Sequence, residues 1–352
     1  MTYQISKEES RRYDALKVLM CLFVLMIHAF SNDFMSSSNG ALAIPYWGSF
    51  VLSRVICDCA VPIFVLISSV LLYAKPIQFG KNAKKKCQSL LIPYLIFNTL
   101  WVLLMFVKHL LGKRLGIQAG DDIDFAAFSP FQWVDAYLGL VGDYKPLLTT
   151  LWYVRDLFLL NLLAVPIKKL VDWMPIPVLI ASVGLWLAGV NVPGIQPYSL
   201  YFFIWGYYLV KYQIHFENWD KRVRLNWLAV AYGLLVAAVS VSQRAFEPLN
   251  RLYLLVAVVF WIRCSTGLLH LEKPAAVVLP ATFFIYLTHR FVYAIIQIVV
   301  NDSLVLYLIT YVLKPVLALA VLLGIFYLLK RLMPGVLAVM VGGRVAKKEA
   351  KA

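Results

Sequence analysis

The sequence predicts an all-α membrane protein, a polytopic bundle of about ten transmembrane helices. The chain has 352 residues, of which 62% are hydrophobic and only 14% are charged, and its mean hydropathy is +0.77. Apolar segments of spanning or near-spanning length recur from one end to the other. Because no internal repeat and no low-complexity tract separates them, we expect residues 1–352 to form a single membrane domain.

The predicted helices follow the apolar segments. Each segment is long enough to cross, or nearly cross, a hydrocarbon layer about 30 Å thick. Pro62 in the second segment and Pro315 in the tenth predict kinks, and the small residues Ser68 and Ser69 favour close helix packing. The ten segments are residues 14–33, 48–74, 88–111, 150–167, 175–191, 197–211, 226–243, 250–270, 275–300 and 303–330.

Basic residues predict how these helices are oriented. The loop at 75–87 carries five lysines and no acidic residue. With ten spans, it lies on the same side as the basic groups at 168–169 and 211–224 and the C-terminal tail. The positive-inside rule makes that side cytoplasmic, which predicts a multi-pass protein of a plasma membrane, the bacterial inner membrane, with both termini inside. The net charge of +15 has the same origin and does not predict nucleic-acid binding.

The long loop at 112–149 is then predicted to lie outside. We expect it to form a lid or a short amphipathic helix, because it holds five aspartates together with a tryptophan and a tyrosine. These residues are Asp121, Asp122, Asp124, Trp133, Asp135, Tyr137 and Asp143.

The cysteines predict neither a disulfide framework nor a metal site. All five lie in or beside apolar runs. Cys57 and Cys59 flank Asp58, but without a partner cluster they are more simply explained as small packing residues. The charged segment at 7–12 precedes an apolar run with no small-residue cleavage site, which predicts a retained helix rather than a signal peptide.

The first segment carries a polar stripe. Lys17 and His28 are eleven residues apart, and at about 100° per residue they share a helix face, about 16 Å apart along the axis. Asp14 lies about 60° behind Lys17. Because ionisable groups inside a membrane face a bundle interior or a watery cavity by default, we expect the stripe to line a path. We expect His28 to share that cavity with Lys17 and His289. The alternative is that Asp14 and Lys17 snorkel at one interface and His28 marks the other.

Other charged residues lie in the second and fourth segments. Arg54 and Asp58 are four residues apart, so they can neutralise each other on a helix. Arg155 and Asp156 are adjacent and point about 100° apart, which argues against a simple pair between them. Asp58 is therefore an alternative partner for Arg155.

Five short motifs, in order and covering essentially the whole chain, resemble those of the acyltransferase family 3 membrane proteins. The first resembles the family's Asp-x-Leu-Arg-Gly, followed by an apolar run and a histidine. The matching stretches are Asp14-x-Leu16-Lys17 with His28, Val61-Pro62-Ile63-Phe64 with Ile67-Ser68-Ser69, Leu90-Leu91-Ile92-Pro93-Tyr94, Leu151-Trp152-Tyr153, and Ile285-Tyr286-Leu287-Thr288-His289.

The chain departs from the family pattern at four places. Val18 and Ser69 replace glycines, Asp58 stands where an arginine is frequent, and Thr150 stands where a histidine is frequent. The last two weaken any carried-over role for the second and fourth helices, but they leave the two histidines unaffected.

The resemblance implies a membrane-embedded O-acyltransferase, most simply an O-acetyltransferase. It would move an acyl group from cytoplasmic acyl-CoA, such as acetyl-CoA, to a hydroxyl of an extracytoplasmic carbohydrate or cell-envelope glycan. Acyl-CoA is then a substrate, and no tightly bound cofactor or metal is expected. The expected partners are acyl-CoA, a carbohydrate or glycolipid acceptor and the lipid bilayer.

The resemblance also assigns roles to residues. His28 is the expected general base, since a neutral imidazole with an ordinary pKa of about 6.5 suits this step; alternatively it is itself acylated. His289 would orient His28, bind acceptor or stabilise the oxyanion. Asp14 and Lys17 would organise the inner mouth. The residues expected to bind donor or substrate are Arg54, Asp58, Lys84, Lys85, Lys86, Tyr94, Trp152, Tyr153, Arg155 and Arg290. The three consecutive lysines suit CoA phosphates, although ordinary positive-inside charge explains them equally well.

Two other function classes fit the same pattern. A transporter or flippase for a lipid-linked sugar or similar solute also uses polar stripes and broken helices. A degenerate relative that serves only as an assembly partner is compatible with Asp58 and Thr150.

Overall fold

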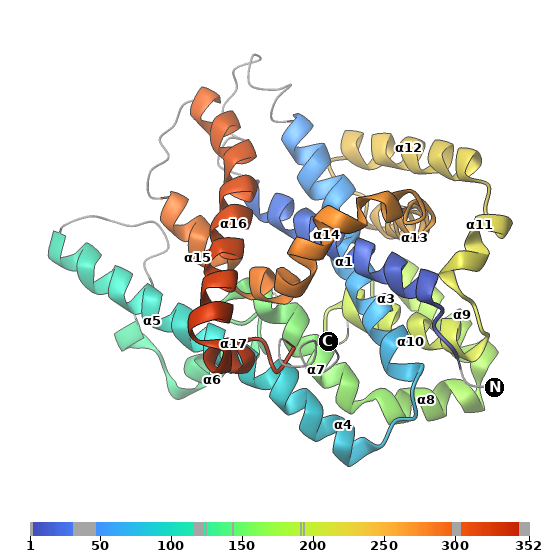
Figure 1. Cartoon of the computed structure of the whole chain (residues 1–352), viewed down its shortest axis with the longest axis horizontal. Helices are drawn as coiled ribbons and strands as arrows, with labels where there is room; N and C mark the ends of the chain where they lie inside the picture. Colours follow the sequence, from blue (N-terminus) through green and yellow to red (C-terminus); the bar gives the residue numbers. More distant parts are fainter. Residues whose placement is uncertain are drawn as a thin grey trace.

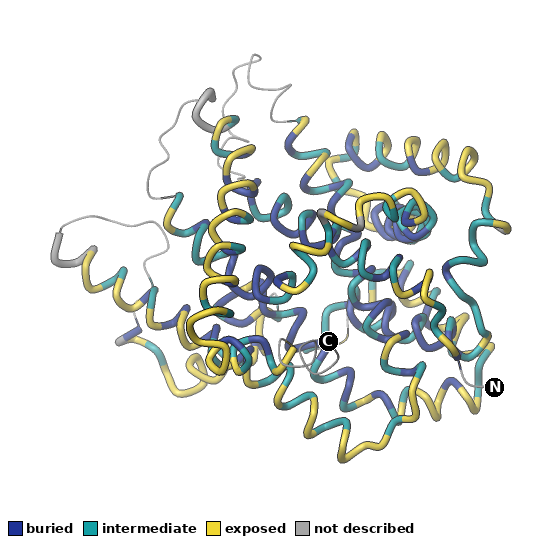
Figure 2. Tube along the Cα trace, viewed as in Figure 1, coloured by how far each residue is buried: buried dark blue, intermediate teal, exposed yellow. Residues whose placement is uncertain are grey.

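The computed structural model describes residues 3–30, 47–115, 125–142, 144–190, 194–297 and 304–344, together with residues 123 and 192. These residues fold almost entirely into helices, which confirms the all-α prediction (Figure 1). The outer helices, such as α12 and α16, expose much of their length, whereas the segments between them are largely buried (Figure 2). Apolar outer surfaces of this kind are expected where lipid surrounds a helix bundle.

The helices follow the predicted segments along the chain. They are α1 (Lys7–Ala29), α3 (Ala60–Tyr73), α4 (Phe79–Lys86), α5 (Ile92–Leu115), α6 (Pro130–Leu138), α7 (Trp152–Leu162), α8 (Ala164–Trp173), α9 (Pro175–Leu187), α10 (Pro197–Lys211), α11 (Trp219–Arg222), α12 (Leu225–Val241), α13 (Glu247–Cys264), α14 (Glu272–Val278), α15 (Thr282–Gln297), α16 (Leu304–Leu332) and α17 (Pro334–Met340).

Within the described part of the chain, four helical stretches have the length and apolar composition of membrane spans. They are Trp47–Tyr73, Phe79–Leu111, Ala275–Ile296 and Leu308–Leu332. The stretches Thr149–Leu162 and Ala164–Trp173 are bent by 60° at the break and make a fifth span if counted as one. The prediction of an integral membrane protein is therefore confirmed, while the number of ten spans stays a prediction.

The second predicted segment is irregular near its middle. It passes through a π-helical turn at Val51–Val55 and a 3₁₀ turn at Ile56–Cys59 before α3 begins. Pro62 has no N–H to donate to the carbonyl of Asp58, which removes one α-helical hydrogen bond just where the 3₁₀ turn gives way to α3. The irregularity lies where the sequence predicts a kink. In contrast, α16 continues through Pro315.

Helix α1 runs through the middle of the bundle, against α3, α15 and α16 (Figure 1). Its first turn is capped by Ser6, whose Oγ accepts from the Glu9 N–H. α3 in turn packs closely on α10, where a Cβ added to Gly206 would lie 2.5 Å from the Ser69 Cβ. The Ser69 Oγ also donates to the Phe203 carbonyl at 2.6 Å. This contact confirms the close packing that the small residue at 69 predicts.

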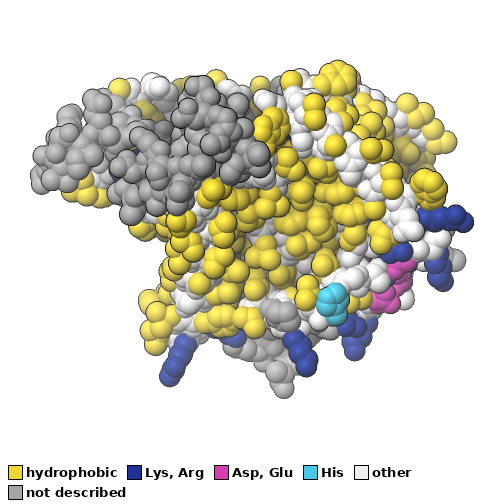
Figure 3. Space-filling view, turned by 90° about the horizontal axis from the view of Figure 1, so that it is seen from above, with side chains coloured by type: hydrophobic (Ala, Val, Ile, Leu, Met, Phe, Trp, Pro, Cys, Tyr) yellow, Lys and Arg dark blue, Asp and Glu magenta, His cyan; other side chains and the backbone are white. Residues whose placement is uncertain are grey.

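Polar contacts gather the predicted inner loops on one side of the bundle. Arg12 of α1 pairs with Asp220, and Lys211 pairs with Asp172 at the end of α8, at 2.8 Å. Arg344, from the C-terminal segment, donates to the Ser89 carbonyl beside α4. In the face seen in Figure 3, hydrophobic side chains form a broad band and Lys and Arg side chains lie along its lower edge. This arrangement is the one the positive-inside pattern predicts; which side is cytoplasmic stays a prediction.

The predicted outer loop contains the short helix α6. Ser129 and Gln132 form a capping box at its start, with Pro130 in the first turn. Asp135 accepts bonds from the backbone N–H groups of Leu140 and Val141 just after the helix. The prediction of a short helix is confirmed, while Asp121, Asp122, Asp124 and Asp143 lie outside the described residues.

Candidate functional site

Two histidines from different helices face each other inside the bundle. The rings of His28, near the end of α1, and His289, in the middle of α15, have centroids 5.1 Å apart. α1 and α15 run in the same direction, because Cys21 lies against Thr282 and Tyr293 donates to the Leu25 carbonyl at 2.8 Å. The structure thus brings together the two histidines that the sequence singles out, and we call them the histidine pair.

The backbone fixes the tautomer of His289. Its Nδ1 lies 2.8 Å from the Tyr286 carbonyl oxygen and 3.1 Å from that of Ile285. A carbonyl oxygen only accepts, so Nδ1 carries the hydrogen and Nε2 keeps its lone pair. The residue is fully buried, and Nε2 has no hydrogen-bond partner among the described residues. A buried acceptor of this kind is costly in a purely structural role and is what a proton-transfer site requires.

Cations surround the histidine pair. Arg54, Lys145 and Arg290 interact electrostatically with His28, which is itself half-buried. Arg54 also lies over the Phe30 ring, at 5.1 Å from its centroid. Positive groups around a reacting centre stabilise a developing oxyanion. Lys145 was not predicted from the sequence, because it lies in the outer loop without a motif.

A cavity of about 450 Å³ lies on the side of the inner loops. Its charged lining residues are Asp14, Lys17, Lys330 and Arg344, and Lys17 pairs with Asp14 at 3.0 Å. The other lining residues are mainly apolar, with hydroxyls from Ser68, Thr282, Tyr153 and Tyr286. A largely apolar cleft with a few convergent polar groups is the usual form of a small-molecule site.

The cavity and the histidine pair are separated, which corrects the expectation that His28 and Lys17 share one space. Neither histidine lines the cavity. Tyr153 and Tyr286 do line it, both are almost fully buried, and their rings meet edge-on with centroids 5.5 Å apart. Tyr286 is one turn before His289, and its hydroxyl donates to the Thr150 carbonyl. The helical rise of about 16 Å from Lys17 to His28 explains why one stripe reaches two separate regions.

The three consecutive lysines do not line the cavity. Lys84 and Lys85 are exposed on α4, and Lys86 is half-buried. Lys86 is near enough to Arg344 for the two charges to repel. The predicted role of these lysines in donor binding stays a prediction, and the residues that line the mouth of the cavity are Lys17, Lys330 and Arg344.

Two expected ion pairs are wrong. Arg155 pairs with its neighbour Asp156, with Nε at 3.0 Å and Nη2 at 2.7 Å from the same carboxylate oxygen, and not with Asp58. Adjacent residues can pair here because the long arginine side chain curls back, while its Nη1 donates to the Leu138 and Gly139 carbonyls. The ion pair of Asp58 is with Arg244, at 3.0 Å, rather than with Arg54.

Two further predicted residues make structural contacts. The Tyr94 hydroxyl donates to the Tyr137 carbonyl and thereby ties α5 to α6. Trp152 lies beside Tyr153, with ring centroids 6.4 Å apart. Their predicted roles in substrate binding stay predictions.

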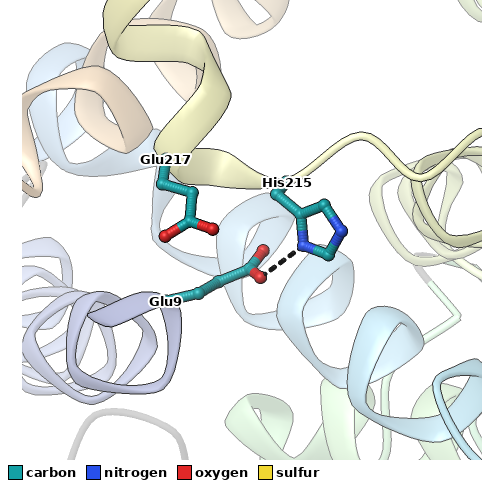
Figure 4. Close-up of side chains that lie close together, drawn as sticks. All are labelled: Glu9, His215 and Glu217. Atoms are coloured by element: carbon teal, nitrogen blue, oxygen red, sulfur yellow. Dashed lines mark hydrogen bonds and ion pairs between the residues drawn. The ribbon is translucent and has the colours of Figure 1, made fainter. Parts of the chain in front are cut away.

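A second polar cluster lies where the N-terminal turn of α1 meets the 214–217 loop (Figure 4). Ligand atoms of Glu9, His215 and Glu217 lie within 4.8 Å of one another, close enough for a metal ion. However, one carboxylate oxygen of Glu9 already accepts from Tyr3, Tyr13 and the Phe216 N–H, and His215 Nδ1 lies 2.7 Å from the other. We therefore interpret the cluster as an anchor for the N-terminus, and the expectation that no metal binds stays a prediction.

Comparison with known proteins defines the class. The family model described as an acyltransferase domain matches residues 11–331, and the chain therefore belongs to acyltransferase family 3 and is a membrane transferase. One similar protein is the succinoglycan biosynthesis protein ExoH of Rhizobium meliloti (strain 1021), which is 22% identical over 356 residues. The alignment covers 96% of this chain and 94% of that protein. No solved structure matches the chain.

Proposed function

We propose that this transferase moves an acyl group from a cytoplasmic acyl-CoA, most simply acetyl-CoA, to a hydroxyl of an extracytoplasmic carbohydrate. The histidine pair carries the proposal, because a buried Nε2 acceptor lies beside a second, half-buried imidazole. The similar protein ExoH is named for succinoglycan biosynthesis, which supports a polysaccharide as the acceptor.

The proposed reaction is a direct transfer. The acceptor hydroxyl loses its proton to His28 as its oxygen attacks the thioester carbonyl. His28 is the base in this scheme because it is half-buried and can meet the acceptor, while His289, held by two backbone carbonyls, orients it. The carbon–sulfur bond then breaks, and the imidazolium returns the proton to the CoA thiolate. Arg54, Lys145 and Arg290 stabilise the oxyanion.

The cavity on the side of the inner loops is the proposed donor site. Its apolar wall suits the acyl and pantetheine groups, and its charged mouth suits phosphates. In this scheme the thioester reaches the histidine pair only by passing Tyr153 and Tyr286, so movement of these rings accompanies transfer.

The test uses full-length protein in sealed proteoliposomes. Labelled acetyl-CoA is added on the side of the cavity, and a hydroxyl-bearing oligosaccharide is enclosed on the other side. We expect an ester on the enclosed oligosaccharide and a matching release of free CoA. Movement of unmodified oligosaccharide without CoA release would instead identify a transporter. Mass spectrometry of envelope glycans from cells with the wild type and with His28→Ala would then identify the natural acceptor.

A further inference from the structure

Positive side chains predominate among the described charged residues that line the cavity. Lys17, Lys330 and Arg344 are positive, and Asp14 is negative. Asp14 lies 3.0 Å from Lys17, so it compensates that lysine first. Lys86 adds to the positive field, because it repels Arg344 without lining the cavity. Cations gathered in a cleft attract an anionic ligand.

Arg344, which lines the cavity, belongs to a segment that follows the residues matched by the family model, 11–331. We call residues 334–344 the C-terminal strap. After α17 the strap turns back at Gly342, whose φ of +63° is left-handed and whose added Cβ would lie 2.4 Å from the Ser89 Cα. No other residue fits so close to a backbone in that conformation. The strap is therefore held against the start of the third predicted span.

Two backbone carbonyls and one ring hold the Arg344 side chain. Its Nη1 donates to Ser89 at 2.9 Å and to Val341 at 2.7 Å, and its guanidinium lies 3.5 Å from the Phe283 ring centroid. Phe283 itself lines the cavity. None of these partners carries a negative charge, so within the described part of the chain the arginine is positioned but not neutralised.

The electrostatic situation of Arg344 favours a ligand of opposite charge. Desolvation by the surrounding protein lowers the pKa of Arg344 to about 10, which is still far above neutral pH, so the guanidinium keeps its charge. Placing this charge near Lys86, which it repels, is costly unless an anion binds beside it. A guanidinium with donors left over is well suited to phosphate oxygens.

We propose that the C-terminal strap is part of the donor site, and that Arg344, near Lys17 in the same lining, binds the phosphate groups of a ligand whose apolar part lies in the cavity. The identification of that ligand as acyl-CoA rests on the function proposed above. An anionic lipid headgroup offers the same phosphate chemistry, and the experiment distinguishes the two sources.

The experiment measures binding to the full-length protein in phosphatidylcholine nanodiscs. The probes are CoA, which carries phosphates, and pantetheine, which carries none. The variants are Arg344→Gln and Arg344→Lys, with Arg331→Gln as the matched control, since Arg331 is exposed and does not line the cavity. The thermal midpoint of each variant checks that it folds, because the Arg344 bonds to Ser89 and Val341 also hold the strap.

A charge-assisted hydrogen bond is worth about 1.5–3 kcal/mol, so Arg344→Gln should weaken CoA binding about 10- to 100-fold and leave pantetheine binding unchanged. Arg344→Lys should weaken CoA binding less, and Arg331→Gln should bind CoA as tightly as the wild type. Equal losses for CoA and pantetheine, or no loss in Arg344→Gln, would overturn the proposal.

A different outcome separates this proposal from the proposed function. If the wild type binds no CoA, the donor half of the proposed function fails. The phosphate site then stands only if added phosphatidylglycerol raises the thermal midpoint of the wild type and fails to do so in Arg344→Gln. If phosphatidylglycerol has the same effect on both, the phosphate site is wrong as well.

Discussion

The cavity and the histidine pair both include residues of α1 and α15 but differ in their surroundings. Asp14 and Lys17 of α1 and Thr282 of α15 line an open, charged cavity. About three turns further along α1, His28 meets His289 in a region where the nearest hydrogen-bond acceptors of His289 are its own helix carbonyls. A charged cleft suits reversible binding of a charged ligand, and a more buried site strengthens electrostatic stabilisation of a transition state.

The two tyrosines between these regions are part of the difference. Tyr153 is held by contact with Tyr286 and lies 3.4 Å from the Ser68 hydroxyl, and Tyr286 is bonded to Thr150. Under the proposed function, this barrier lets the protein bind a donor without exposing the reacting groups to water from the same side. In the proposed scheme, binding and chemistry are therefore affected by different substitutions.

The largest effect is expected at the histidine pair. His28→Ala and His289→Ala should each lower kcat about 10²- to 10⁴-fold, because the first removes the base and the second the residue that orients it, and should leave the KM for acyl-CoA within about twofold. His270→Ala is the matched control, since His270 lies outside both regions. Steady-state transfer of label from acyl-CoA to acceptor measures both constants. A large rise in KM with unchanged kcat would break the proposed division between the two regions.

At the cavity we expect a smaller effect, and we expect it on the KM for acyl-CoA rather than on kcat. Lys17→Gln should raise the KM for acyl-CoA about tenfold, the equivalent of one charge-assisted bond, with little change in kcat. The triple substitution of Lys84, Lys85 and Lys86 by Gln should raise KM less, about threefold, because these side chains act from outside the cavity through screened charge. If the triple variant lost more donor affinity than Lys17→Gln, the donor would bind along α4 rather than in the cavity.

The sequence predicts the two members of the histidine pair on different grounds. For His28 the ground is physical, because a stripe of ionisable residues on an apolar helix has to face the interior. For His289 it is the resemblance of Ile285-Tyr286-Leu287-Thr288-His289 to the family motif. The same reasoning cannot find the barrier between Lys17 and His28, since helical periodicity fixes a face but not what covers it. Tyr286 belongs to a recognised motif, yet its place at the inner end of the cavity depends on packing against Tyr153.

Long side chains and chain reversals explain the remaining differences. The pairing of Arg155 with Asp156 depends on a curled arginine that also satisfies loop carbonyls, so the angle between adjacent residues is a poor guide. Arg344 reaches the cavity only because the C-terminal strap turns back at Gly342. In the sequence, Arg344 is one of several basic residues of an inner tail, and nothing local distinguishes it.

The most direct test of the central claim is a double-mutant cycle on the histidine pair. Single-turnover acyl transfer is measured in the wild type, His28→Ala, His289→Ala and the double variant, all with acyl-CoA at saturation. Residues that act as one unit show strongly non-additive losses, so the account predicts that the double variant is no slower than the slower single variant. If the two losses multiply instead, the histidines act independently and the proposed pair is wrong.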